Sequence, residues 1–387
     1  MQATMAERMD RLPKQFFANL VARVNERIRA GHDVINLGQG NPDLPTPTHI
    51  VEALRQAALD PKTHRYSPFT GLPTLKRAVA EFYDREYGVK LDPEREVAIL
   101  FGGKTGLVEL SEIYLNPGDV ALVPDPGYPD YLSGIALAGG EMVPYPIVAE
   151  NAYRPDLSGV TEAQWQRAKL WFLNYPNNPT GAAVDLACFE EAVSIASARG
   201  VILVHDFAYG AIGYDGFRPP SFLMTPGAKE TGIEIYTMSK TYNMAGWRLA
   251  FAVGHPDVIA AINLMQDHYY VSVFPAVQLA GVAALTGPQD CVRELVATYQ
   301  ARRDAFLGEL AERGVNVPAP KGSFFVWMPV PQGFTSASFA DHLLERANVM
   351  VAPGIGFGGH GEGYVRIGLL DGVDRLREAA RRIASVL

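Results

Sequence analysis

Residues 170–204, LWFLNYPNNPTGAAVDLACFEEAVSIASARGVILV, contain two short apolar runs with a helical pattern between them. The runs at 170–173 and 201–204 are apolar on both faces, which is typical of strands buried in a parallel sheet. Between them, apolar residues recur at helical spacing across 188–200, and Gly200 is expected to end that helix. The stretch therefore predicts a β-α-β unit, in which a helix joins two parallel strands.

Further apolar runs of strand length flank this unit along the chain. They are VAIL (97–100), VALV (120–123), IEIY (233–236) and LAFAV (249–253). Residues 71–87 add an amphipathic helix that Gly88 is expected to end. Together these segments predict an α/β fold with a mostly parallel sheet between layers of helices.

The pattern changes near residue 290. A long helical segment at 289–313 precedes shorter apolar runs, at 324–330, 349–354 and 364–370. We therefore expect a smaller α+β domain at the C-terminal end. The predicted organisation is an N-terminal segment packed on the small domain (1–45), a large domain (46–289) and the small C-terminal domain (290–387).

The composition excludes several classes of protein. Of 387 residues, 48% are hydrophobic and 20% charged, which supplies a buried core and rules out disorder for most of the chain. With a formal charge of −8 and no dense Lys/Arg run, nucleic acid is not an expected partner. The two cysteines, Cys188 and Cys291, fit neither a disulfide framework nor a zinc site, so we expect no metal. No signal peptide or membrane-spanning stretch is visible, which favours a soluble cytoplasmic protein without a membrane partner.

Polar residues of special type follow several of the apolar runs, where ligands bind in open α/β sheets. The glycines of FGGKTG (101–106) precede a predicted helix whose first N–H groups suit a phosphate, although such glycines often only form the turn. Asn178 lies in a loop of turn formers, NYPNNPTG (174–181), and its amide could also bind a ligand oxygen.

Two further clusters are charged. Asp206 follows the run at 201–204 and either caps a helix or, if ionised there, needs a cationic partner. Lys240 lies in TMSKTYNMAGWRLA (237–250), between two predicted buried strands and eight residues before Arg248. It is either a solvated loop lysine or an amine of lowered pKa that can form a Schiff base.

In this order and at these separations, the four segments resemble the fold-type I pyridoxal-phosphate aminotransferases of class I and II. The resemblance covers nearly the whole chain, through NLGQGNPD (36–43), HRYSPFTG (64–71), NNPTG (177–181), SKTYNMAGWR (239–248) and YVRIG (364–368). It implies a mostly parallel seven-stranded sheet in the large domain and pyridoxal 5'-phosphate as cofactor. One departure is Phe207, because many relatives have an acid just after the aspartate; the core chemistry does not depend on that position.

The resemblance also assigns roles to individual residues. Lys240 would hold the cofactor through a Schiff base and later move the substrate's Cα proton. Asp206 would pair with the protonated pyridine nitrogen, so that the ring withdraws electrons. Tyr209 and Asn178 would donate hydrogen bonds to the ring's phenolic oxygen, and Tyr128 would stack on the ring face.

Other matched residues would bind the phosphate and the substrate carboxylate. The phosphate group would be held by side chains and backbone of Gly103, Lys104, Thr105, Thr237, Ser239 and Arg248. Arg366 would bind the substrate α-carboxylate, with Gly40 and Asn178 beside it, although an arginine there could also form a surface salt bridge. Tyr66 matches the tyrosine that the family contributes across a dimer interface, which implies a homodimer.

Within the family, the segments resemble the methionine-salvage transaminases, which aminate 4-methylthio-2-oxobutyrate to methionine by a ping-pong mechanism. Glutamine, glutamate, or branched or aromatic amino acids would be the donors. We therefore expect an apolar substrate pocket without a second arginine opposite Arg366. Aromatic residues that could line it, or could instead belong to the core or a dimer interface, are Phe16, Phe17, Tyr269, Tyr270 and Phe274.

Several alternatives stay open at this point. LL-diaminopimelate, aspartate, alanine and aromatic aminotransferases share the catalytic residues and differ mainly in pocket shape. A cystathionine β-lyase would use the same residues for elimination at Cβ. We do not expect a DNA-binding regulator, because the aminotransferase pattern begins close to the first residue. A cofactor-free binding protein is hard to reconcile with the presence of Lys240, Asp206, Arg248 and Arg366 together.

Overall fold

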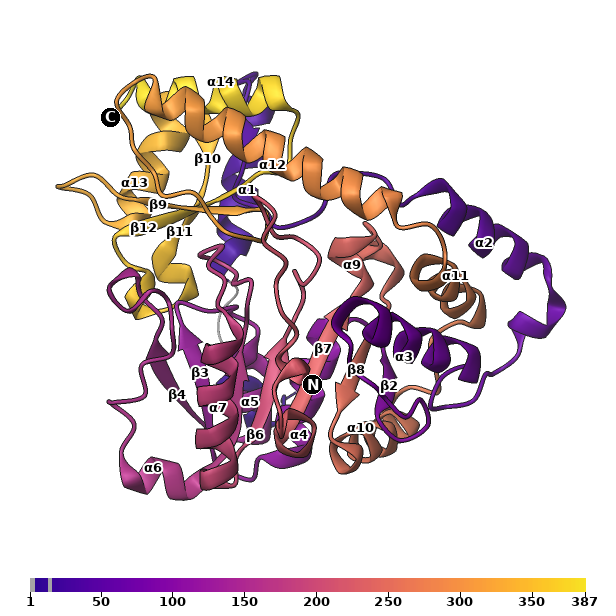
Figure 1. Cartoon of the computed structure of the whole chain (residues 1–387). Helices are drawn as coiled ribbons and strands as arrows, with labels where there is room; N and C mark the ends of the chain where they lie inside the picture. Colours follow the sequence, from indigo (N-terminus) through magenta and orange to yellow (C-terminus); the bar gives the residue numbers. More distant parts are fainter. Residues whose placement is uncertain (1–3, 13–15) are drawn as a thin grey trace.

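A seven-stranded sheet forms the centre of the molecule in the computed structural model, which describes residues 4–12 and 16–387, with backbone alone at 16–20 (Figure 1). In order across the sheet, the strands are β2 (Val97–Leu100), β8 (Ala250–Gly254), β7 (Gly232–Thr237), β6 (Ile202–Asp206), β5 (Ala168–Leu173), β3 (Val120–Asp125) and β4 (Glu141–Pro146). Neighbours are parallel except at β8, which is antiparallel to both β2 and β7. The predicted mostly parallel sheet is confirmed.

The edge strand β4 is absent from the apolar runs of the sequence. Its residues alternate between buried and more exposed positions, and they include Pro144 and Pro146. β4 pairs with β3 on one side and lies at the edge of the sheet on the other. Prolines are tolerated there because an edge strand has backbone groups that face no ladder partner. An edge strand of this kind produces no continuous apolar run, so the pattern revealed only six strands.

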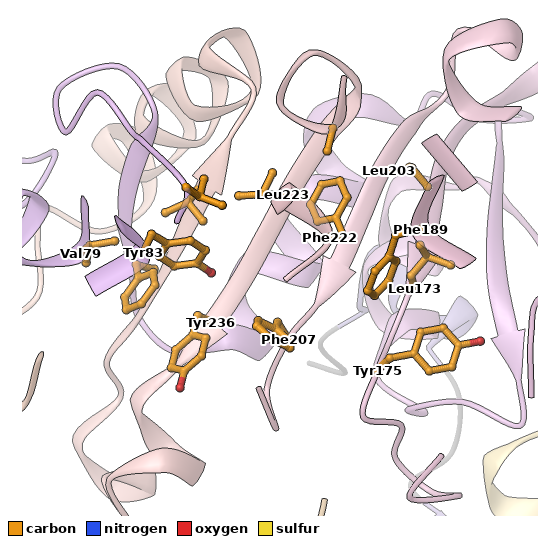
Figure 2. Close-up of a cluster of buried hydrophobic side chains, with 14 of the residues drawn as sticks. Val79, Tyr83, Leu173, Tyr175, Phe189, Leu203, Phe207, Phe222, Leu223 and Tyr236 are labelled. Carbon is orange, nitrogen blue, oxygen red and sulfur yellow. The ribbon is translucent and has the colours of Figure 1, made fainter. Parts of the chain in front are cut away.

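Helices cover both faces of the sheet. One face packs on α3 (Pro73–Tyr87), α7 (Leu186–Arg199) and α11 (Pro275–Thr286), and Figure 2 shows part of this core. The other face packs on α4 (Gly103–Tyr114), α5 (Tyr131–Ala138) and α10 (Pro256–Tyr269). The helices predicted at 71–87 and 188–200 are confirmed, and each ends at a glycine with left-handed φ, 68° at Gly88 and 66° at Gly200. Shorter or peripheral helices are α2 (Thr48–Leu59), α6 (Glu162–Arg167), α8 (Ala228–Thr231) and α9 (Met238–Thr241).

The C-terminal part, residues 290–387, has a separate sheet and a separate core, to which residues outside this range also contribute, namely Ile35, Leu37, Tyr209, Ile212 and Tyr214. Its antiparallel sheet has the order β11-β12-β9, with β9 (Phe325–Pro329), β11 (Ala352–Pro353) and β12 (Tyr364–Gly368). Helices α12 (Asp290–Ala311), α13 (Ser336–His342) and α14 (Val373–Ala384) contribute to the same core. This part, orange to yellow, lies above the large sheet in Figure 1. The smaller α+β element is confirmed, while the domain boundaries at 45 and 289 stay predictions.

The N-terminal segment runs beside this C-terminal part. β1 (Ile35–Asn36) pairs in parallel with β10 (Val349–Met350), and the Gly368 N–H donates to the Leu37 carbonyl at 2.7 Å. On α1 (Phe16–Arg29), Arg27 donates to the Asn348 side chain at 2.7 Å. These contacts place residues near both ends of the chain beside one another.

Two properties of the described residues bear on possible partners. None of their helices has both the length and the apolar character needed to cross a membrane. Over the same part of the chain, His, Cys, Asp and Glu side chains do not gather in groups of three or more that could hold a metal ion. Cys188 is buried in the first core face and Cys291 is partly exposed, and both are free thiols.

Candidate active site

A cavity of about 850 Å³ lies at the carboxyl ends of β3, β5, β6 and β7, where the large sheet meets the C-terminal part. This is the edge at which open α/β sheets bind ligands. The predicted site residues that line the cavity are Gly40, Gly103, Lys104, Tyr128, Asn178, Asp206, Tyr209, Thr237, Ser239, Lys240, Arg248 and Arg366. Tyr66 and Thr105 are not among the lining residues.

Lys240 enters the cavity from the turn that follows β7. The Thr237 hydroxyl accepts a hydrogen bond from the Ser239 N–H at 3.2 Å, which caps the short helix α9 that holds the lysine. The Lys240 Nζ donates to the Gly40 carbonyl at 2.9 Å. Burial, together with the positive charges of Arg366 and Arg248, lowers the pKa of Lys240 to about 8, while the charge of Asp206 acts in the opposite direction. Near neutral pH, an appreciable fraction of this amine is unprotonated, as a nucleophile requires.

Asp206 ends β6 and is only 7% exposed. The Tyr131 hydroxyl donates to its Oδ2 at 3.0 Å. Burial raises the pKa of Asp206 to about 6, while the Tyr131 hydrogen bond and the charges of His205 and Lys240 act in the opposite direction. A turn rather than a helix follows β6, so the interpretation of Asp206 as a helix cap is wrong. A buried carboxylate in a cavity favours a cationic ligand group beside it.

Two residues around Asp206 were missed by the sequence analysis. Tyr131 comes from α5, 75 residues away in sequence, and nothing local marks its hydroxyl as a partner of the aspartate. The Asn174 amide donates to the Asp206 carbonyl at 2.8 Å, and its Oδ1 accepts from the Asn178 N–H at 2.9 Å. Asn174 lies in the loop of turn formers, where an asparagine needs no other explanation than the turn.

Arg248 and the start of α4 form an anion-binding corner. A Cβ atom at Gly102 would lie 2.2 Å from the Arg248 Nη2, and φ of Gly102 is +92°, so only glycine fits beneath the guanidinium. The hydroxyls of Thr237 and Ser239 are 2.9 Å apart at the same corner. α4 begins at Gly103, and its first N–H groups and its dipole favour an anion. A guanidinium, two hydroxyls and a helix start are the donor set that a phosphate group requires.

Some of the predicted phosphate-binding residues have their side chains engaged elsewhere. The Thr105 hydroxyl donates to the Phe101 carbonyl at 3.1 Å. The Lys104 Nζ pairs with Asp130 at 2.8 Å, and this side chain is half exposed. At the start of α4, these two residues can therefore offer backbone N–H groups rather than side chains. Tyr66 is 85% exposed and lies outside the cavity of its own chain.

Arg366 lies on β12, across the cavity from the large sheet. Its Nη1 donates to the Asn178 Oδ1 at 2.9 Å and its Nη2 to the Gly38 carbonyl at 2.9 Å. The guanidinium carbon lies 4.2 Å and 4.6 Å from the ring centroids of Phe325 and Phe357. Burial lowers the pKa of Arg366 to about 10, so the group remains cationic at neutral pH. Since Arg366 is only 6% exposed, the interpretation as a surface salt bridge is wrong.

Two tyrosines line the same cavity as Asp206 and Arg366. Tyr128 and Tyr209 both line the cavity, and burial raises the pKa of each hydroxyl above its usual range. Both hydroxyls are therefore protonated and can donate hydrogen bonds. Tyr209 is held edge-on against Phe324 and Phe325, with ring centroids 5.3 and 5.8 Å apart. These positions suit the roles that the sequence analysis expects for both residues.

Aliphatic side chains and a methionine line the cavity where the N-terminal segment approaches β10. They are Leu12, Val21, Val24 and Met350. Of the aromatic candidates, Tyr269, Tyr270 and Phe274 do not line the cavity, and the side chains of Phe16 and Phe17 lie outside the described residues. Tyr270 packs on Phe101 instead, while Tyr269 and Phe274 are about half exposed. The described lining residues include no arginine besides Arg248 and Arg366.

Known proteins are similar to this chain in sequence and in structure. The model of the family "Aminotransferase class I and II" matches residues 32–383. L-glutamine–4-(methylsulfanyl)-2-oxobutanoate aminotransferase of Bacillus subtilis is 59% identical over 97% of this chain and 94% of the relative. LL-diaminopimelate aminotransferase of Moorella thermoacetica is 48% identical over 99% and 98%.

Among solved structures, substrate-bound BacF from Bacillus subtilis superimposes with a TM-score of 0.95 at 48% identity, covering 100% of this chain and 98% of that one. The match extends over both the large sheet and the C-terminal part, and the family match includes every cavity-lining segment from Asn36 onward. The chain therefore belongs to the class I and II aminotransferases, whose cofactor is pyridoxal 5'-phosphate.

Proposed function

We propose that this aminotransferase transfers the amino group of L-glutamine to 4-(methylsulfanyl)-2-oxobutanoate, which yields L-methionine. The observation that supports this most directly is the lining of the cavity. Leu12, Val21 and Met350 line it where the N-terminal segment approaches β10, and the described lining residues include no arginine besides Arg248 and Arg366. A methylsulfanyl chain packs well against aliphatic groups and a thioether. The 59% identical relative is named for the same two substrates.

The residues of the cavity fit pyridoxal 5'-phosphate. The corner of Arg248, Thr237 and Ser239 with the start of α4 would bind the phosphate, and Asp206 would face a protonated ring nitrogen. The cofactor supplies an aldehyde carbon that binds an amino group, and a ring that withdraws electrons from the Cα–H bond. Asp206, kept in place by Tyr131 and by the backbone link to Asn174, would keep that ring cationic.

Lys240 would act first as a nucleophile and then as a proton carrier. Its lowered pKa of about 8 leaves part of the amine free near neutral pH. Its hydrogen bond to the Gly40 carbonyl holds the Nζ within the cavity. The segment that contains Gly40 also approaches Arg366. From there the amine would take the substrate's Cα proton and pass it to the former aldehyde carbon of the cofactor, and it would move a proton in the opposite direction during the second half of the ping-pong cycle.

Arg366 would bind the α-carboxylate that both substrates share. Its guanidinium is oriented by Asn178 and Gly38 and held between two aromatic rings, so its two terminal nitrogens are pre-aligned for a bidentate contact. A Cβ atom at Gly40 would lie 3.1 Å from Phe325, so glycine lets this backbone approach the carboxylate site closely. Fixing the carboxylate orients the Cα–H bond toward Lys240.

The test is a comparison of kcat/KM for substrate pairs with the purified holoenzyme. We expect kcat/KM for glutamine with 4-(methylsulfanyl)-2-oxobutanoate to exceed kcat/KM for LL-diaminopimelate with 2-oxoglutarate, and for aspartate with 2-oxoglutarate, by at least about tenfold. The reason is that each competing pair places a charged group at the aliphatic wall. A higher kcat/KM for either competitor would replace the proposed substrate. Release of pyruvate from cystathionine, measured in the same preparation, would instead indicate elimination at Cβ.

We also propose that the active unit is a homodimer in which Tyr66 reaches the partner's phosphate site. Tyr66 is 85% exposed, and Phe69, Tyr269 and Phe274 are further exposed aromatic side chains. Sedimentation equilibrium should give twice the mass of 42.1 kDa. In mixtures of Tyr66→Phe and Lys240→Ala chains, hybrid dimers should bind the cofactor more tightly at one site than Tyr66→Phe homodimers do. A monomer would exclude the arrangement.

A further inference from the structure

A buried polar cluster lies on the face of the large sheet that packs on α3 and α7, opposite the face on which the Asp206 side chain contacts Tyr131. Glu234 of β7 is fully buried, and its carboxylate accepts hydrogen bonds from the Tyr83 hydroxyl (2.7 Å), the Ser221 hydroxyl (2.7 Å), the Phe222 N–H (3.0 Å) and the His205 Nδ1 (2.7 Å). None of these residues lines the cavity. A carboxylate with this many donors is well compensated for its burial.

His205 connects this cluster to the active-site loop. The Glu234 carboxylate already has three other donors, so the Nδ1 of His205 is the donor of the fourth hydrogen bond. Its Nε2 lies 3.3 Å from the Tyr175 nitrogen and 3.1 Å from the Tyr175 oxygen. The imidazole can therefore accept from the Tyr175 N–H when neutral, or donate to its carbonyl when protonated.

Aromatic side chains enclose His205 and leave the imidazole little freedom to move. The ring centroids of Phe189, Phe207 and Phe222 lie 4.9, 5.0 and 5.9 Å from that of His205. Figure 2 shows these three phenylalanines, of which Phe189 lies next to Tyr175. Since His205 is itself 0% exposed, its orientation is set by this packing and by Glu234.

Tyr175 lies between the two asparagines that act in the cavity. Its neighbour Asn174 donates to the Asp206 carbonyl and accepts from the Asn178 N–H, and Asn178 in turn accepts from Arg366. Successive residues of a strand point to opposite faces, so His205 reaches behind the sheet while Asp206 faces the cavity. The end of β6 thus contacts the loop at 174–181 twice, through His205 on one face of the sheet and through Asp206 on the other.

We infer that His205, oriented by Glu234, is a positioning residue for the active site, which holds the Tyr175 backbone so that Asn174, Asn178 and Asp206 keep their places. The inference uses the roles proposed above for Asp206 and Arg366, but it does not depend on which amino acid is the substrate. A residue needed only to fill the core would require no polar group here, because burying one costs free energy unless it is paired.

The test uses two variants, each of which keeps the contact of only one of the two imidazole nitrogens of His205. In His205→Gln the side-chain amide reaches the position of Nε2 and can keep the contact with Tyr175, whereas in His205→Asn it reaches Nδ1 and keeps only the contact with Glu234. We expect His205→Asn to weaken binding of pyridoxal 5'-phosphate to the cofactor-free protein about tenfold, the effect of one lost hydrogen bond, and to raise KM for the amino donor. His205→Gln should stay within about threefold of the parent protein on both measures.

Tyr83→Phe is the matched control, because it removes a different donor from the same carboxylate without touching the loop. It should lower the melting temperature while leaving the cofactor dissociation constant and KM unchanged. If His205→Asn binds the cofactor as the parent does, or if both His205 variants lose affinity equally, the inference is wrong and the cluster is structural only. Should His205→Asn fail to fold, the same pair is compared in a Glu234→Gln background, which removes the buried charge. Asp206→Asn, measured alongside, tests the proposed ring-nitrogen role separately.

Discussion

The two walls of the cavity are built in different ways. The cofactor wall consists of the ends of β3, β5, β6 and β7 with the start of α4. Its residues Lys104, Asp206, Lys240 and Arg248 all lie within four residues of a predicted strand. The substrate wall consists of residues from the N-terminal segment and from the C-terminal part, namely Leu12, Val21, Val24, Asn36, Gly38, Gln39, Gly40, Asn41, Phe325, Met350, Gly356, Phe357 and Arg366. The cofactor wall forms at the edge of the large sheet alone. The substrate wall forms only when segments near both ends of the chain meet, as they do where β1 pairs with β10.

We expect the two walls to have different roles, the cofactor wall in the chemical steps and the substrate wall in the choice of substrate. Lys240, Asp206 and Arg248 belong to the cofactor wall, where burial shifts the pKa values of Lys240 and Asp206 toward neutrality. Apart from Arg366, the described residues of the substrate wall offer apolar side chains, glycines and the uncharged amides of Asn36, Gln39 and Asn41. We therefore expect changes in the cofactor wall to affect turnover with every substrate, and changes in the substrate wall to affect the choice among substrates.

The largest expected effect is that of Lys240→Ala in the cofactor wall. Loss of the proton carrier alone should lower kcat by roughly 10²- to 10⁴-fold for every substrate pair. Steady-state kinetics measures this, and circular dichroism checks that the fold is retained. Lys104→Ala is the control, since that lysine also lines the cavity but pairs with Asp130, and it should stay within a few-fold of the parent. Normal turnover by Lys240→Ala would refute the proposed mechanism.

Among changes in the substrate wall, Arg366→Gln should have the largest effect. Two charge-assisted hydrogen bonds to the carboxylate are lost, so KM for amino donors should rise roughly 100-fold or more. Arg366→Lys retains the charge without the fork and should recover only part of the loss. Because the carboxylate is common to all substrates, the rise should be similar for glutamine and methionine. A variant that loses only methionine would place Arg366 at the side chain of the substrate instead.

Asp206→Asn should change how the stability of the cofactor-free protein depends on pH. Burial raises the pKa of Asp206 from 3.8 to about 6, so its ionised form is disfavoured in the folded state. Its ionisation therefore lowers the folding stability as pH rises from about 4 to 6, by up to roughly 3 kcal/mol.

Melting temperatures measured between pH 4.5 and 8 should accordingly show cofactor-free Asp206→Asn to be more stable than the parent above pH 6. The advantage should shrink as pH falls. With pyridoxal 5'-phosphate bound, the order should reverse, because the carboxylate gains its cationic partner. A constant difference across the pH range would mean that Asp206 does not carry this buried charge.

Met350→Ala should change substrate preference rather than turnover in general. We expect kcat/KM for 4-(methylsulfanyl)-2-oxobutanoate to fall about tenfold relative to that for pyruvate, since only the longer chain reaches the apolar wall. Met328→Ala is the control, because Met328 is buried in the core of the C-terminal part and does not line the cavity. Equal losses for both oxo acids would show that Met350 does not contact the distal group.

His360→Ala tests the contact between the two walls and should have the smallest effect. The His360 Nδ1 lies 3.0 Å from Asp125 at the end of β3, and the same loop supplies Phe357 beside Arg366. The histidine side chain is 48% exposed, and exposed pairs contribute at most about 1 kcal/mol. KM should therefore rise only about two- to threefold, in contrast to the fully buried His205. A change in kcat without one in KM would exclude a role in substrate binding.

Most residues that the sequence predicts for the cofactor line one cavity, because their signals are local. Lys240 and Asp206 lie within four residues after apolar runs, and parallel strands bring such residues to one edge of a sheet. Tyr131 escaped the analysis because its partner lies 75 residues away, and its own helix is largely apolar. The apolar residues Leu12 and Val21 escaped for a similar reason, since no local pattern distinguishes an aliphatic cavity lining from ordinary core.

By itself, the sequence determined the α/β class, the positions of six of the seven strands of the large sheet along the chain, and the candidate residues for the chemistry, because apolar periodicity and polar residues at strand ends act over short distances. Only the tertiary structure decided that Arg366 is buried between two rings, that Gly102 lies beneath Arg248, and that His205 contacts Tyr175 from behind the sheet. These depend on packing between segments far apart along the chain, and close packing of such segments decides both the burial that shifts a pKa and the neighbours that orient a side chain.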